Sequence, residues 1–442
     1  MLRRLNLLLA AVFLLPAGPA FAQQAPVFNS GDTAWMIVAT GLVFLMTIPG
    51  LALFYGGMVR KFNVLATVMQ CFAICCAISI VWMILGYSLA FTPGSGFVGG
   101  LSRFFLAGLA PASATLTIPE TVFMMFQMSF AVITPALITG AFADRMKFSS
   151  LLLFTVLWSL VVYAPVAHWA WEATGWLLIK GVLDFAGGTV VHINAGVAGL
   201  VAALVIGKRS GYPAEPFLPH NLVLSVIGAS FLWIGWFGFN AGSALSAGPR
   251  AGMALAATHI AASAAALSWL AVEWWLRGKP SVLGGISGAV AGLVAITPAA
   301  GYVDPSGALL IGLIAGVVCF WGATWLKHRF GYDDSLDCFG IHGVGGIVGA
   351  LLTGVFAKVA IANSEGGYAS ALAADPGFTL GLLEGNVGQL WIQLVAVGAT
   401  VAWCAVATYV LLKLIDLAIG LRVDREIEQT GLDLALHGEA VR

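Results

Sequence analysis

Long apolar segments alternate with short polar links along almost the whole chain. The segments cover residues 32–57, 63–91, 120–143, 148–168, 188–207, 221–245, 251–276, 281–299, 306–326, 341–359 and 389–419. Each approaches or exceeds the roughly 20 apolar residues that a helix needs to cross the hydrocarbon core of a bilayer. The pattern predicts an all-α polytopic membrane protein with eleven transmembrane helices.

Composition favours the same fold class. The chain has 442 residues, of which 60% are hydrophobic and only 9% are charged, and its mean hydropathy is +0.96. Soluble domains are far more polar, so they are excluded. Because the formal net charge is zero, no general attraction to nucleic acid is expected. The 54 glycines indicate that the helices approach one another closely, as small residues allow in lipid.

The first 22 residues are typical of a cleaved signal peptide. They contain basic residues at 3 and 4, an apolar core at 5–15, and the small-x-small cleavage site Ala20-Phe21-Ala22. The alternative is an uncleaved first membrane helix, which the short apolar core and the two prolines after it disfavour. We therefore expect residues 23–419 to form the transmembrane domain and residues 420–442 to form a cytoplasmic tail.

Basic residues are unevenly divided between the two sides of the predicted bundle. Fourteen fall on one side, namely Arg60, Lys61, Arg145, Lys147, Lys208, Arg209, Arg277, Lys279, Lys327, Arg329, Lys413, Arg422, Arg425 and Arg442. Four fall on the other side, namely Arg103, Lys180, Arg250 and Lys358. Because cytoplasmic loops carry an excess of Lys and Arg, we expect a periplasmic mature N-terminus and a cytoplasmic C-terminus, with the protein in the inner (plasma) membrane.

No residue pattern indicates a metal site, a cofactor or an enzyme active centre. The six cysteines fall in or beside apolar segments and lack metal-ligand spacing, so they are interpreted as core residues rather than as disulfides or ligands. The sequence also contains no nucleotide-binding loop, zinc signature or nucleophile elbow. A membrane enzyme is therefore disfavoured.

Two of the apolar segments carry a histidine. His192 lies in DFAGGTVVHINAGVAGL (184–200) of the fifth predicted span, and His342 lies in DCFGIHGVGGIVGA (337–350) of the tenth. Ionisable side chains inside membrane helices are costly and indicate function. Each ring could simply bond to a neighbouring helix, but the matched placement favours a pore lined by both. Five spans plus five predict an inverted repeat, with the eleventh helix outside it.

A second set of candidate residues is largely aromatic. It comprises Phe126 and Phe130 on one face of the third span, Trp236, Phe239 and Ser243 on one face of the sixth, and Trp171 at the exported end of the fourth. Aromatic faces attract cations, and a serine hydroxyl adds an acceptor. Aromatic residues at helical spacing can equally be ordinary core residues.

Asp184 stands just before the predicted start of the fifth span. A negative charge near a helix N-terminus is favoured by the helix dipole, and it could also attract a cation below an exported vestibule. Both roles stay open. Asp337 has the equivalent place before the tenth span and is interpreted as structural, because it follows two other aspartates.

In these stretches the sequence resembles ammonium transporters of the Amt/Mep/Rh superfamily, from about Asp32 to the C-terminus. The matching motifs are FYGGMVR (54–60), GAFADRMKF (140–148), DFAGGTVVHINAG (184–196), GWFGFNAGS (235–243), RGKPS (277–281), FGIHGVGGIVG (339–349) and GLRVDREIEQTGLDLALHGE (420–439). Trp171 and Ser243 make the chain more similar to the Amt branch than to the Rh branch.

The resemblance implies an eleven-helix protomer, a homotrimer with one pore per protomer, and ammonium, ammonia and methylammonium as substrates. It implies an external ammonium site at Trp171, Phe126 and Ser243, a gate at Phe130 and Phe239, a pore along Trp236, His192 and His342, and a buried carboxylate at Asp184. Ammonium would lose its proton near that carboxylate before ammonia crosses, and the route of the proton stays open. A PII-type signalling protein would dock at the tail.

Two features depart from the family's pattern. Met128-Ser129 stands between the third-span phenylalanines where smaller residues are common, and Cys338 stands where valine is expected. These residues concern the fine geometry of the pore. The alternative functions are an ammonium sensor with a transporter-like core and an Rh-like gas channel.

Overall fold

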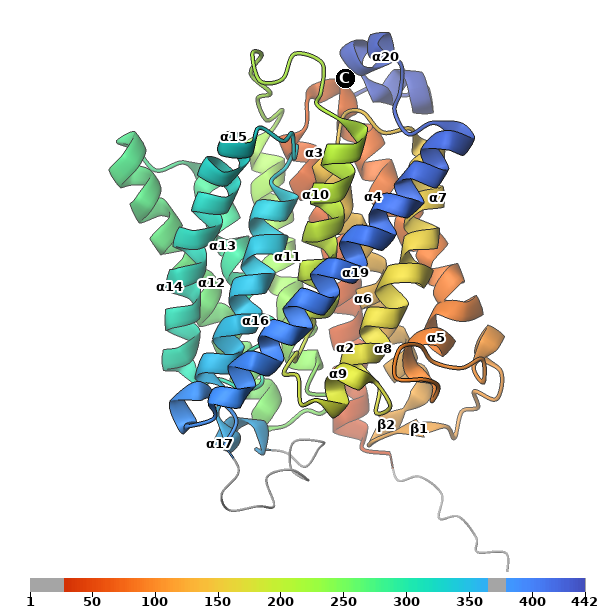
Figure 1. The fold of residues 1–442 in the computed structure, drawn as a ribbon, viewed down its shortest axis with the longest axis vertical. Coiled ribbons are helices and arrows are strands. Elements are labelled where there is room, and N and C mark those ends of the chain that lie inside the picture. Colours follow the sequence, from red (N-terminus) through yellow and green to blue (C-terminus); the bar gives the residue numbers. More distant parts are fainter. Residues whose placement is uncertain (1–27, 365–378, 442) are drawn as a thin grey trace, which may run out of the picture.

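The apolar segments form a bundle of helices in this computed structural model, which describes residues 28–364 and 379–441 (Figure 1). Within these residues ten helices are long and apolar enough to cross a membrane, and an eleventh apolar helix of 15 residues is shorter. The all-α class and the eleven spans are therefore confirmed, with one two-stranded hairpin added, β1 (Ala114–Thr115) and β2 (Ile118–Pro119). The predicted signal peptide, residues 1–22, lies outside the described residues.

Each span consists of one to three consecutive helical segments, and the segments labelled η are π-helical turns. The first six spans are α2 (Ser30–Leu45), η1 (Met46–Leu51) and α3 (Ala52–Met58); α4 (Val64–Val81), η3 (Trp82–Gly86) and α5 (Tyr87–Phe91); α6 (Glu120–Phe142); α7 (Phe148–Trp158), η5 (Ser159–Tyr163) and α8 (Ala164–Trp171); η6 (Gly188–Ile193) and α10 (Asn194–Ile206); and α11 (Leu222–Gly242).

The other five spans follow the same plan. They are α12 (Pro249–Arg277); α13 (Val282–Ile296); α14 (Pro305–Trp321), η7 (Gly322–Leu326) and α15 (Lys327–Phe330); η8 (Phe339–Gly343) and α16 (Val344–Phe356); and α19 (Val387–Ile419). The short segments α9 (Trp176–Ile179), α17 (Val359–Ala362), α20 (Arg425–Thr430) and η10 (Asp433–His437) lie outside the spans.

The spans stand side by side, and the two described ends of the chain lie at opposite ends of the bundle (Figure 1). Opposite ends require an odd number of crossings, as eleven spans provide. We call the end that holds α15 and α20 the tail face, and the end that holds α9, α17 and the β-hairpin the hairpin face. Helix α19 runs obliquely across the bundle and packs on α10, α16 and α7 (Figure 1).

The fifth and tenth spans match each other in detail. Each begins with a π-helical turn that carries the histidine and continues as a 13-residue α-helix. A Cβ on Gly196 would lie 2.1 Å from the backbone nitrogen of Gly343, so only glycine allows this approach. A Cβ on Gly346 would lie 3.0 Å from the carbonyl oxygen of Gly188. This reciprocal packing holds the two histidine-bearing turns against each other.

An aspartate caps the start of each of these two spans. The carboxylate of Asp184 accepts hydrogen bonds of 3.0, 3.0 and 3.1 Å from three backbone amides around the start of η6. At η8 the equivalent bonds, 3.0 and 2.7 Å, are made by Asp334. Asp337 instead pairs with Lys327 at 2.8 Å. The sequence-based match of Asp184 with Asp337 is therefore wrong, and Asp334 is the true counterpart.

Arg145 joins three inter-span links at the tail face. Its side chain is 0% exposed and donates five hydrogen bonds of 2.6–3.2 Å, four to backbone carbonyl oxygens and one to Ser335 Oγ. Burial lowers the pKa of Arg145 to about 10. Next to it, Arg209 pairs with Asp333 at 2.8 Å and with Asp144 at 3.4 Å. The links 143–147, 207–209 and 333–335 thus share one buried polar cluster.

The tail packs onto this face. Arg422 forms an antiparallel bridge with Met146, and Glu428, which is 1% exposed, accepts a hydrogen bond from the Arg422 guanidinium at 2.7 Å. Asp433 accepts hydrogen bonds of 3.1 and 2.8 Å from two backbone amides at the start of α4. These amides lack intrahelical partners because they lie in the first turn, so the tail completes the second span.

Candidate functional site

The two histidines that were expected to line a pore are in contact. The Nδ1 atoms of His192 and His342 lie 3.3 Å apart, and the rings stack with centroids 5.4 Å apart and 15° between their planes. The side chains are buried, with exposed fractions of 1% and 4%. A neutral pair can share one proton between these nitrogens, one as donor and one as acceptor. The expectation that the rings lie within reach of each other is confirmed.

His192 also stacks on Trp236, with ring centroids 5.3 Å apart and 21° between the planes. The indole is fixed because its Nε1 donates a hydrogen bond of 2.8 Å to Thr297 Oγ1. Among the described residues, the buried Nε2 of His192 has no hydrogen-bond partner. A cavity of about 10 Å³ is lined by both histidines and by Trp236 and Phe239. That volume is close to the minimum that one water-sized molecule needs.

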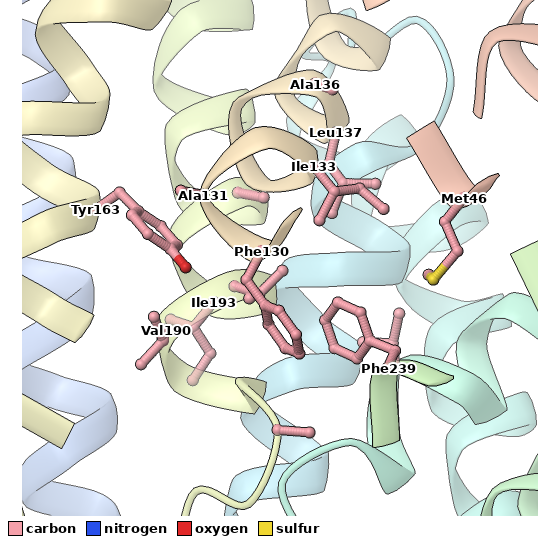
Figure 2. Packing of buried hydrophobic residues seen from close by; sticks show 14 of the residues in the cluster. Met46, Phe130, Ala131, Ile133, Ala136, Leu137, Tyr163, Val190, Ile193 and Phe239 are labelled. Carbon is pink, nitrogen blue, oxygen red and sulfur yellow. The ribbon is translucent and has the colours of Figure 1, made fainter. Parts of the chain in front are cut away.

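Phe130 and Phe239 close this cavity on the side of the hairpin face. Their rings stack with centroids 4.1 Å apart and 27° between the planes (Figure 2). They are 1% and 0% exposed, and the Phe239 ring lies 6.1 Å from the ring of His192. Because stacked rings leave no gap between them, at least one ring must rotate before a molecule can pass.

A larger cavity lies beyond the stacked phenylalanines. Trp171, the last residue of α8, meets Phe130 edge to face at 5.8 Å. This cavity of about 140 Å³, which we call the outer cage, is lined by Phe91, Phe123, Gln127, Phe130, Trp171, Phe185, Ser243 and Leu245. Five of these eight residues are aromatic, so the outer cage presents π faces to any small cation that enters it.

Two polar side chains complete the outer cage. Ser243 Oγ donates a hydrogen bond of 2.9 Å to the carbonyl oxygen of Phe239, which leaves its lone pairs available as acceptors. Gln127 is 8% exposed, and its amide oxygen has no hydrogen-bond partner among the described residues. An unpaired buried acceptor is costly, and an N–H donor inside the cage would satisfy it.

Phe126 packs behind the outer cage and does not line it. Its ring lies 4.9 Å from the ring of Phe130. A Cβ on Gly242 would lie 2.8 Å from the Phe126 ring, so this ring fills the space against α11. Phe126 therefore packs against Phe130 without being among the residues that line the outer cage.

Five residues of the outer cage were not identified from the sequence, namely Phe91, Phe123, Gln127, Phe185 and Leu245. Phe123 and Gln127 share a face of α6 with Phe130 at steps of four and three, so the helical period of that span was a usable signal. A glutamine in the middle of an apolar span was a second signal. Phe185 lies in the loop before η6, where no period exists to indicate which way a side chain points.

Asp184 lies beside the outer cage. Its carbonyl oxygen accepts a hydrogen bond of 2.8 Å from Trp171 Nε1, and its carboxylate caps η6. The side chain is 5% exposed. Burial raises the pKa of this carboxyl group, while the backbone amides that bond to the charged form oppose the shift. One residue thus connects the tryptophan at the cage with the turn that carries His192.

The two departures from the family's pattern lie outside the cavities described above. Cys338 is 1% exposed and directs its Sγ to the carbonyl oxygens of Leu137 and Ala195, at 3.4 and 3.6 Å. Met128 is 6% exposed and is absent from the residues that line the cavities. Both side chains pack between helices.

Comparisons with known proteins agree on one family. The model described as Ammonium Transporter Family matches residues 34–442. An ammonium transporter of Bacillus subtilis is 51% identical over 411 residues, which cover 92% of this chain and 98% of that protein. Ammonium transporter Amt1 of Archaeoglobus fulgidus is 44% identical over 414 residues, which cover 93% and 99%.

Solved structures give the same result. The crystal structure of Saccharomyces cerevisiae Mep2 has a TM-score of 0.83 and 36% identity, and the match covers 90% of each chain. A structure titled Sensor Amt Protein also has a TM-score of 0.83, with 29% identity and coverage of 92% of this chain and 98% of that chain. The fold is thus shared by proteins whose titles differ in function.

Proposed function

The chain belongs to the ammonium transporter family, and we propose that it captures ammonium in the outer cage, where the cation loses one proton, and that ammonia crosses along His192 and His342 while the proton either returns outside or follows through the two imidazoles. The observation that carries this proposal is a continuous file of rings. It runs from Trp171 to Phe130 and Phe239, and then to His192 and His342, with neighbouring ring centroids 5.8, 4.1, 6.1 and 5.4 Å apart.

Capture depends on replacing part of the water around the cation. A π face attracts a cation by about 0.5–1 kcal/mol at an exposed site and by about 2 kcal/mol or more at a desolvated one. The hydroxyl of Ser243 and the amide oxygen of Gln127 provide acceptors for two N–H groups of ammonium. Together these groups compensate for lost hydration at the entrance, where the outer cage adjoins a wider vestibule of about 540 Å³.

Beyond the stacked phenylalanines the cavity is narrow and nearly apolar. The free energy needed to remove the water from a charged ion there would be prohibitive, whereas the cost for neutral ammonia is much smaller. The unpartnered Nε2 of His192 can exchange a hydrogen bond with ammonia, as acceptor or donor according to the tautomer. Potassium has no proton to lose, so this mechanism excludes it.

Reconstituted vesicles given an ammonium pulse test the route of the proton. Current that accompanies ammonia flux supports proton co-transport, and flux without current contradicts it.

Replacement of Trp171 with leucine should raise the KM for methylammonium uptake about tenfold. Loss of one strong cation–π contact of about 1–2 kcal/mol corresponds to roughly a 5–30-fold weaker capture. The measurement is the concentration dependence of radiolabelled methylammonium uptake. Trp275→Leu is the matched control, because this tryptophan is 83% exposed on the outside of the bundle. An unchanged KM for Trp171→Leu would remove this residue from the capture site.

We place the hairpin face in the periplasm and the tail face in the cytoplasm, in the inner membrane. The basic residues of the links support this orientation.

We also propose that the protein forms a homotrimer and that a PII-type protein binds the tail face. The packing of the tail on the links at 143–147 and 207–209 supports the second idea, because a partner there would contact segments connected to the spans. Native mass measurement and pull-down with a PII-type protein test the two ideas.

Replacement of Asp433 with alanine should release the tail and reduce uptake several-fold. Two amides at the start of α4 would lose their acceptor, at a cost of about 1–3 kcal/mol each when buried. The measurements are limited proteolysis of the tail and initial uptake rate. Glu426→Ala removes an exposed carboxylate from the same tail and serves as the control. A variant whose tail stays protected and whose uptake is normal would show that this cap has no such role.

An ammonium sensor is the second candidate, because the structure titled Sensor Amt Protein shares the fold. An Rh-like gas channel is disfavoured by the cation-binding character of the outer cage. Uptake of radiolabelled methylammonium by cells that lack their own transporters separates the sensor from our proposal. Binding without uptake would identify a sensor.

A further inference from the structure

Arg250 places a positive charge beside the outer cage. It is the second residue of α12, and its guanidinium carbon lies 4.8 Å from the centroid of the Phe185 ring and 5.0 Å from that of Tyr302. Its Nε donates a hydrogen bond of 3.1 Å to the carbonyl oxygen of Gly301. The contacts with Phe185, Tyr302 and the carbonyl oxygen of Gly301 help to hold the guanidinium in one place.

Phe185 is the wall that separates this guanidinium from the outer cage. Its ring lines both the outer cage and the wider vestibule, and Arg250 lines the vestibule. The ring is fixed by close packing: a Cβ on Gly301 would lie 2.2 Å from it, so only glycine leaves room there. The Tyr302 ring supports it from the side, with centroids 5.7 Å apart and 74° between the planes.

A cation in the outer cage would therefore share an aromatic ring with a fixed cation. The π electrons of Phe185 already interact with Arg250, so they attract a second cation less strongly. The two charges also repel each other directly, to an extent that depends on the water between them. Lys180 lines the same vestibule but is exposed, so solvent screens it more.

The geometry points to Arg250 as a residue that sets the affinity of ammonium capture, by weakening the hold of the outer cage on its cation. This inference rests on the proposed function. A conduction pathway requires that an ion bind well enough to enter and weakly enough to leave. Arg250 supplies the second requirement at the entrance, and it makes capture dependent on ionic strength.

The test is methylammonium uptake by reconstituted full-length protein carrying Arg250→Gln, at about 10 and 300 mM sodium chloride. At low salt the variant should show a KM about threefold below that of the unmodified protein. At high salt the difference should shrink, because the screening length falls from about 30 Å to well under 10 Å. Arg250→Lys retains the charge and should keep a KM close to that of the unmodified protein.

Arg329→Gln removes one positive charge from exposed α15 on the opposite face, and it should leave the KM unchanged. A raised KM for Arg250→Gln, equal at both salt concentrations, would mean that Arg250 only holds Phe185 in place and would overturn the inference. An unchanged KM would overturn it as well. If Arg250→Gln does not fold, Arg250→Lys provides the test instead. A KM that differs from that of the unmodified protein by the same factor at both salt concentrations would also overturn the inference. Absence of uptake by the unmodified protein would instead refute the proposed function.

Discussion

Replacing Asp184 with alanine should reduce ammonium uptake at least a hundredfold. The carboxylate accepts three backbone amides at 3.0–3.1 Å around the start of η6, and each buried donor left unpaired costs about 1–3 kcal/mol. The π-helical turn that positions His192 would lose its cap. The carbonyl oxygen of residue 184, which accepts the hydrogen bond from Trp171 Nε1, is retained in the alanine variant, so Trp171 would be displaced only as far as the uncapped backbone shifts. Initial uptake rate and thermal unfolding in detergent are the measurements.

Two further variants separate the possible roles of Asp184. Asn retains one oxygen for the backbone amides, so Asp184→Asn should recover much of the unfolding temperature and remain at least tenfold slower in uptake if the negative charge assists proton loss. Normal uptake by the asparagine variant would leave only the capping role. Asp304→Ala is the matched control, because Asp304 caps α14 at 2.9 Å on the same face and lines none of the three cavities along the proposed path. Wild-type uptake by Asp184→Ala would contradict both roles.

Replacing His192 and His342 together with alanine should reduce uptake at least tenfold. The double variant removes every side-chain hydrogen-bonding group that the two rings give to the small central cavity. It also leaves Trp236 without its stacking partner, so the apolar passage would widen and lose its shape. Each single variant should be less affected, because the remaining ring can still bond a passing ammonia molecule.

Uptake of methylammonium and the accompanying current should be measured on the same vesicles. His259→Ala is the control, since this histidine is exposed on α12. Flux in the double variant that equals that of the unmodified protein would show that the imidazoles are dispensable. A current that persists while flux is lost would indicate that the widened passage admits ions.

The sequence predicted those parts of the site that lie on periodic helices. The fifth and tenth spans could be matched because both carry a histidine among small residues. The helical spacing of Phe130 and Phe239 left a core role open for them, and only the resemblance to the family implied that they form a gate. Span boundaries were close as well. The fourth span was predicted to end at residue 168 and extends to Trp171 in the structure. Trp171 itself was expected at the exported end of this span.

The remaining parts depend on contacts that leave no local signal. Phe185 and Arg250 meet across 65 positions of sequence, from a loop and a helix start. Asp334 rather than Asp337 caps η8. The sequence could not identify the capping residue, because three aspartates within five residues cannot be told apart without the turn geometry. The π-helical form of the two histidine-bearing turns is likewise set by how the spans pack and not by their composition.

The contact between Asp433 and the start of α4 has a consequence for biogenesis. Asp433 accepts a hydrogen bond from the backbone amide of Ala66, which lies 367 residues earlier in the chain. The ribosome therefore adds this aspartate only after every span has been synthesised. The second span therefore stays incomplete at its first turn throughout translation. A message that ends just before the codon for Asp433 would yield a chain with all eleven spans and a defect at the second, which quality-control proteases would detect far from the site of the truncation.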